Sequence, residues 1–375
     1  MKKKLNKKEF CDEILKLAPS EYDASKCDFQ QHLENLFNRY IKLLDRLDES
    51  EYRKRWGSWD EKKEAIIKFC DAIKESINLY YEGRHSCAFT HLWNHINEIS
   101  FNSTLFYGKD LYRMRMFDEG EKHNRNGMFH IPFNKRTIVK TQRYSAPGYP
   151  CLYLGKSAYI CWEEMLRPNL DKCYVSRFHT DEPMFVYDLT LPSISKWNNN
   201  IDAFRDDLLS FPLVIACMVK VAKPKDPFKP EYIIPQLLME LVIEERQNVR
   251  IINVSKKIII GIAYTSVHKS NDFKFTPDKS VNLAIPAFPP AIGDYSMKLC
   301  EMFKVTDPTC DELERAKRPY EIIERDRDMT DLEYSYRIST FGQLEARLNE
   351  EKKFPLKKVR NVTKTDIYSK EVLFE

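Results

Sequence analysis

The spacing of apolar residues changes near position 105, and this change constrains the fold more than any other feature. Up to that point, apolar side chains recur every three or four residues, which is the period of an amphipathic helix. The period is clear in Leu33, Leu36, Phe37, Tyr40, Ile41 and Leu44, and it continues through 60–82 and 85–99, which Gly83 separates. Residues 1–105 are therefore predicted to form a small helical bundle.

From 106 to 300 the apolar residues come in short runs that are rich in β-branched and aromatic side chains. The predicted strands lie within 137–140, 151–154, 184–189, 213–221 and 249–262. Helical patterns intervene at 157–166, 200–209 and 233–245. Many short strands with few helices between them predict an α+β fold for this region.

The chain becomes polar and charged after residue 300. Residues 311–337 are typical of an exposed helix that Pro319 interrupts, and 338–375 offer little core material. The predicted organisation is a helical N-terminal domain over 1–105, a catalytic domain over 106–300 and a polar C-terminal extension over 301–375.

Charge and hydropathy limit the classes of protein. Lys and Arg number 60 and Asp and Glu 56, so the net charge of +4 carries no strong signal for nucleic-acid binding. No apolar run is long enough to span a bilayer, and no apolar segment follows the basic start as in a signal peptide. Ten cysteines without a C-x-x-C pair are typical of buried thiols, so we predict a cytoplasmic protein without a membrane segment.

Metal and nucleotide motifs are incomplete. His91 and His95 lie one helical turn apart near His85 and Cys87, but no H-E-x-x-H pattern is present, so no metal is predicted. Gly155-Lys156-Ser157 resembles the end of a Walker A loop whose first glycine is replaced by Pro150. Basic and aromatic residues alternate in 111–115 and 135–144. This pattern fits nucleic acid, a strand of paired arginines or a pocket for a small anion.

The residues that indicate a chemical function lie within 143–164. Arg143 precedes a Pro-Gly turn, Tyr153 lies in a short predicted strand, and Glu164 falls in the second turn of a predicted helix that Ser157 caps. Turn, strand and helix can bring an arginine, a tyrosine and a carboxylate to one cleft. A shared site and ordinary structural roles for these side chains both remain open from spacing alone.

These residues resemble the RES domain family, named for its Arg, Glu and Ser. The matching pieces, spread over 108–290, are Leu111-Tyr112-Arg113, Gln142-Arg143-Tyr144-Ser145, Leu152-Tyr153-Leu154-Gly155, Glu164, the run 232–238 and Gly261 to Ser266. Many members carry alanine where this chain has Gly155, and typical members are shorter. RES proteins are toxins of bacterial toxin–antitoxin pairs, with a fold similar to ADP-ribosyltransferases, and they consume NAD.

The resemblance implies roles for individual residues. Glu164 would stabilise the oxocarbenium-like sugar that forms when the nicotinamide–ribose bond breaks. Arg143, with Arg113 or Arg115, would bind the phosphates, and Tyr144, next to Arg143 in the same motif, would also contact NAD. Tyr153 would stack on nicotinamide and Ser266 would bind the adjacent ribose. NAD is then the substrate, and no separate cofactor is implied.

The predicted function is NAD degradation by a glycohydrolase or phosphorylase, as a bacterial toxin or defence effector. A mono-ADP-ribosyltransferase acting on a protein or nucleic acid is the first alternative, because the same cleft would serve it. A non-enzymatic helical binding module is the second. Residues 1–105 are expected to engage an antitoxin or another regulatory protein, or to mediate homo-oligomerisation, with simple packing as the alternative.

Overall fold

The structure is a computed structural model that describes residues 3–48, 50, 56–99, 101, 103–106, 108–252, 258–268, 275–320 and 323–361. Its contacts divide the chain into two compact units. The first unit comprises Met1–Thr104, Gln142–Tyr144 and Tyr187–Ile262, and the second comprises Leu105–Thr141, Ser145–Val186 and Ala263–Glu375. Each unit therefore joins segments that are distant in sequence. The three predicted domains, with boundaries at 105 and 300, stay predictions.

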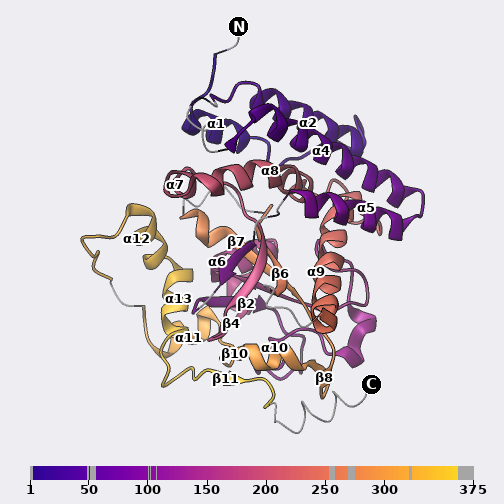
Figure 1. Ribbon diagram of the computed structural model, residues 1–375. Coiled ribbons are helices and arrows are strands. Elements are labelled where there is room, and N and C mark those ends of the chain that lie inside the picture. Colours follow the sequence, from indigo (N-terminus) through magenta and orange to yellow (C-terminus); the bar gives the residue numbers. More distant parts are fainter. Residues whose placement is uncertain are drawn as a thin grey trace. The chain divides into compact units, whose positions relative to one another are not determined.

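The first unit is largely helical. Its helices are α1 (Lys7–Ile14), α2 (Phe29–Leu44), α4 (Trp59–Tyr81), α5 (His85–Glu98), α7 (Ile194–Asn199), α8 (Ile201–Cys217) and α9 (Ile233–Ile252), with the 3-10 turn η3 (Pro230–Tyr232) before α9. The side chains of Asp28 and Ser58 accept hydrogen bonds at the starts of α2 and α4, and Gly83, with φ +76°, ends α4. The predicted helices before residue 105 are confirmed, and α4 packs between α2 and α5 (Figure 1).

Two predicted strands are wrong. The run 213–221 continues α8 as far as Cys217, because the helix that Asn200 caps is buried on every side along this stretch. A continuous apolar run fits a buried helix as well as a buried strand. The run 137–140 overlaps the 3-10 helix η1 (Phe133–Ile138), in which no side chain is buried to support a strand. The predicted strand over 249–262 is divided in the structure. Its first residues belong to α9, residues 253–257 lie outside the described residues, and β6 begins at Ile259.

A nine-stranded sheet has the order β1-β5-β6-β7-β3-β2-β4-β10-β11. Its strands are β1 (Ser103–Phe106), β2 (Asp110–Arg115), β3 (Cys151–Gly155), β4 (Tyr174–His179), β5 (Met184–Leu189), β6 (Ile259–Thr265), β7 (Val281–Pro286), β10 (Lys304–Val305) and β11 (Lys357–Lys358). The ladders from β7 to β11 lie within the second unit and are antiparallel. A small hairpin joins β8 (Ala291–Ile292) to β9 (Tyr295–Ser296). The predicted α+β class is confirmed.

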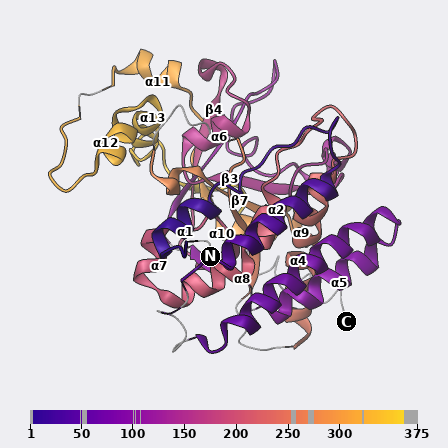
Figure 2. The same cartoon turned by 90° about the horizontal axis from the view of Figure 1, so that it is seen from above.

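Helices of the second unit come from the middle and the end of the chain. They are α6 (Ala158–Glu164), α10 (Met297–Met302), α11 (Asp311–Lys317), α12 (Asp331–Ile338) and α13 (Thr340–Leu348), with the 3-10 turns η2 (Leu170–Lys172) and η4 (Pro277–Ser280). Phe341, Leu344 and Leu348 of α13 belong to the core that also holds Tyr159 of α6. The expectation that 338–375 adds little core material is therefore wrong for this helix, which lies beside α12 (Figure 2).

No helix within the described part of the chain is both long and apolar enough to cross a bilayer.

Candidate functional site

Strands β2 and β3 of the second unit share a single residue pair, Tyr112 with Gly155. In contrast, β2 pairs with β4 along its whole length, and β3 does so with β7. Most of β3 is therefore not paired with β2, although the two strands are neighbours in the sheet. Tyr153, half-buried, lies on this part of β3, and its hydroxyl is 3.1 Å from the Ser145 hydroxyl.

Helix α6 presents Glu164 at its last position. The Ser157 hydroxyl starts the helix by accepting a hydrogen bond from the Ile160 N–H at 3.1 Å. Glu164 is half-buried, and its Oε1 accepts a hydrogen bond from Nδ2 of Asn282 on β7 at 2.7 Å. The predicted helix and its cap are confirmed, and a strand side chain holds the carboxylate at the helix end.

The neighbouring carboxylate has a different environment. Glu163 is 2% exposed and forms a two-pronged ion pair with Arg167, with both N–O distances at 3.0 Å. Arg167 thus neutralises the charge of Glu163. No lysine, arginine or histidine among the described residues forms an ion pair with Glu164.

Arg113 and Arg115 alternate along β2 and differ in their partners. Arg115 donates to the Gly127 carbonyl and to Glu121, both at 2.7 Å, so it secures the loop after β2. Nη1 of Arg113 is buried and has no hydrogen-bond partner. Burial, and then the charge of Arg115, lowers the pKa of Arg113 to about 10, while the nearby Tyr153 opposes this shift. Arg113 is still charged at neutral pH, and it fits an anion better than Arg115 does.

Ser266 is fully buried directly after β6. Its N–H donates to the Ser280 carbonyl at 3.0 Å, and its hydroxyl accepts a hydrogen bond from the His268 N–H at 3.0 Å. These contacts close a turn. Ser280, the partner of Ser266, lies two residues before Asn282 in the sequence. The predicted contact of Ser266 with the ribose stays a prediction.

Arg143 and Tyr144 belong to the first unit. Arg143 donates to the Cys217 carbonyl at 2.9 Å, and its guanidinium lies 5.2 Å from the centre of the Tyr232 ring. Tyr144 is 1% exposed, so its ring packs in a core. The structure joins Glu164 to Asn282 in the second unit. Because Tyr112 pairs with Gly155, its neighbour Arg113 points to the opposite face of the sheet from Tyr153. The predicted roles of Arg143 and Tyr144 stay predictions.

A buried carboxylate that the sequence reasoning missed holds the start of α6. Oε1 of Glu345 on α13 accepts a hydrogen bond from the Ala158 N–H at 2.7 Å and another from the Tyr336 hydroxyl, and Lys279 lies 3.5 Å from Oε2. Burial raises the pKa of Glu345, which Lys279 and Tyr336 partly offset. A glutamate within a polar C-terminal segment gives no sequence signal of this role. Asn282, by contrast, is a polar residue within an apolar run, which is a usable signal.

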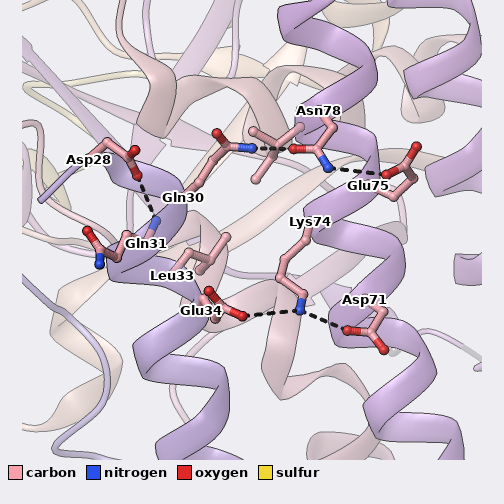
Figure 3. A pocket seen from close by; sticks show the side chains of 10 residues that line it. Asp28, Gln30, Gln31, Leu33, Glu34, Asp71, Lys74, Glu75 and Asn78 are labelled. Carbon is pink, nitrogen blue, oxygen red and sulfur yellow. Dashed lines mark hydrogen bonds and ion pairs between the residues drawn. The ribbon is translucent and has the colours of Figure 1, made fainter.

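A groove of about 660 Å³ lies between α2 and α4 of the first unit (Figure 3). Its lining is mostly acidic or amide, and the side chains bind each other. Asn78 accepts from Gln30 and donates to Glu75 at 3.2 Å, while Lys74 pairs with Asp71 at 2.9 Å.

The predicted histidine cluster lies on α5, where the ring centres of His91 and His95 are 4.6 Å apart. Within the described ranges, no three His, Cys, Asp or Glu side chains are grouped to hold a metal ion.

Comparison with known proteins finds a relative among curated sequences. Over 304 residues, which cover 75% of this chain, the sequence is 33% identical to the protein named "Putative toxin YopC" of Bacillus subtilis (strain 168). The matched part spans 65% of the length of that relative. No protein-family model matches the chain. No solved structure matches it. The resemblance to RES domains, and to their ADP-ribosyltransferase-like core, therefore stays a prediction.

Proposed function

We propose that this protein is a toxin that consumes NAD by breaking the nicotinamide–ribose bond. The observation that carries the proposal is the pair Glu164–Asn282, a half-buried carboxylate whose position is fixed at 2.7 Å by a neutral donor. A carboxylate held in this way can stabilise a developing positive charge without reorganising during the reaction. The toxin role is supported by the name of the Bacillus subtilis relative.

In the proposed reaction, the bond between ribose C1′ and the pyridinium nitrogen breaks and its electrons pass to that nitrogen. Nicotinamide leaves as a neutral molecule, and the sugar becomes an oxocarbenium-like cation. The Glu164 carboxylate stabilises this cation. Water or phosphate then adds at C1′; water loses a proton to solvent as ADP-ribose forms.

Arg113 supports the proposal that the protein binds NAD. A buried guanidinium with an unpartnered Nη1 is costly unless an anion completes its hydrogen bonds. The pyrophosphate of NAD is such an anion, and a guanidinium can bind it with two parallel hydrogen bonds. Tyr153 on β3 offers an aromatic face for nicotinamide.

The test follows NAD and free nicotinamide with purified wild type, Glu164→Gln and Glu163→Gln. We expect Glu164→Gln to lower turnover at least about 100-fold with an unchanged circular dichroism spectrum, because only the charge is lost. Glu163→Gln should lower stability and keep turnover, since Glu163 is neutralised by Arg167. Full activity of Glu164→Gln would refute the assignment.

The products distinguish the acceptors. Free ADP-ribose from labelled NAD indicates a glycohydrolase, and a phosphate-dependent product indicates a phosphorylase. Label on a protein or nucleic acid indicates the ADP-ribosyltransferase instead. If saturating NAD does not raise the melting temperature of the wild type, the non-enzymatic binding module is favoured, because a ligand at 100 times its Kd should add about 2.7 kcal/mol.

A further inference from the structure

Asn282 is an unexpected residue for its place in the fold. Every position of β7 is buried, and Asn282 itself is 4% exposed. Asparagine is depleted in strands, and a buried amide costs free energy unless it is hydrogen-bonded. An apolar residue, like those on either side of it, would suit the strand better. The contact between its Nδ2 and the Glu164 carboxylate explains why the amide is there.

The donor that holds Glu164 is neutral, and this has a chemical consequence. A carboxylate at the C-terminal end of a helix lies near the partial negative charge of the last carbonyls, so it needs another group to hold it there. A cation would do this, as Arg167 does for Glu163, but it would also cancel the negative charge. The amide of Asn282 orients the carboxylate and leaves its charge in place.

The register of β3 and β7 connects this contact to the rest of the site. Asn282 lies directly opposite Gly155, and Tyr153 lies opposite Ala284. Residues two apart in a strand point to the same face, so Tyr153 and Asn282 share one face of the sheet. Gly155 lets α6 approach this face, because a Cβ there would be 2.6 Å from Cγ2 of Ile160.

We infer that Asn282 is a positioning residue for Glu164, and that its role depends on its being a neutral donor. The inference rests on the proposed function. Asn282 acts through the carboxylate and does not itself contact the sugar. Removing its amide frees the side chain of Glu164 to leave the position where the positive charge develops.

The experiment compares NAD turnover by the full-length wild type, Asn282→Leu and Asn282→Asp. Leucine suits a buried strand and removes the donor, so this variant keeps the fold. Aspartate keeps the shape and places a second carboxylate beside Glu164. We expect kcat to fall about 100-fold in both, because a displaced catalytic group costs about that factor, with KM within about threefold of the wild type. In a Glu164→Gln background, Asn282→Leu should cause no further loss.

Asn134→Ala is the matched control. It removes a hydrogen bond of the same kind in the same unit, from Nδ2 to Asp294 at 3.0 Å, and should leave kcat unchanged. If folded Asn282→Leu keeps the wild-type kcat while Glu164→Gln is inactive, the inference is wrong and the proposed function stands. If the wild type consumes no NAD, the inference and the proposed function are both wrong. If Glu164→Gln consumes NAD as fast as the wild type, the inference and the assignment of Glu164 are wrong, whereas NAD consumption stands.

Discussion

Replacing Gly155 with alanine should displace the helix that carries Glu164. Gly155 ends β3, and a Cβ built on it would lie 2.6 Å from Cγ2 of Ile160 and 2.8 Å from Sγ of Cys161. Non-bonded carbon atoms prefer at least about 3.5 Å, so α6 must move away by about 0.9 Å. The clash cannot be relieved by the Ile160 side chain alone, because a β-branched χ1 is stiff in a helix.

Two effects of measurable size follow. Overpacking of this kind costs about 1–3 kcal/mol of unfolding free energy. A movement of about 0.9 Å would also stretch the bond of 2.7 Å between Asn282 and Glu164 beyond hydrogen-bonding distance, and a misplacement of about 1 Å can cost about 100-fold in rate.

The assay combines urea unfolding, followed by circular dichroism, with NAD turnover. Gly108→Ala is the control, since Gly108 has φ +58° and no atom lies within 4 Å of the position that an added Cβ would take. Its cost is the strain of the left-handed backbone, about 1–2 kcal/mol, and α6 stays in place. We therefore expect similar losses of stability and a loss of turnover only in Gly155→Ala. Wild-type stability and turnover in Gly155→Ala would refute the reasoning.

Three further predictions follow from single contacts. Arg113→Met should raise the urea midpoint, because it removes a buried cation with an unpartnered nitrogen, and should raise the KM for NAD at least about 10-fold; a lower midpoint would contradict this. Because the folded-state pKa of Glu345 is raised above 4.5, the contribution of this group to the free energy of unfolding is greatest below pH 4.5 and is lost as the pH rises through the folded pKa. Glu345→Gln should lack that decline in unfolding measured from pH 4.5 to 8, and an identical pH profile would count against it. Arg143→Ala should lower NAD affinity if the residue binds phosphate as the RES resemblance implies; unchanged affinity would limit Arg143 to its bond with the Cys217 carbonyl.

The helices before residue 105 were predictable because each has its own local signals. Apolar residues follow the helical period, Asp28 and Ser58 cap the starts, and Gly83 ends α4. The run 213–221 lacked such a signal. Its apolar side chains have no polar face, so only the tertiary burial of α8 decides between helix and strand.

The C-terminal segment shows a second limit. Its charged residues predict an exposed surface, yet α13 buries Phe341 and Leu344 against α6 and places Glu345 at the first turn of that helix. The contact joins residues 187 apart in sequence. No local pattern identifies such a partner, because the free energy of burying a carboxylate depends on the donors that surround it.

Glu163 and Glu164 show most clearly what the structure adds. Adjacent helical positions differ in direction by about 100°, so the two carboxylates face different surroundings. Their partners separate them chemically. Arg167 neutralises Glu163, whereas Asn282 holds Glu164 without cancelling its charge. The signal for Asn282 was present as a polar residue within an apolar strand, but its partner lies 118 positions away and became visible only in the fold. A polar residue that a buried strand has no reason to keep is therefore a good place to look for the group that orients a catalytic side chain.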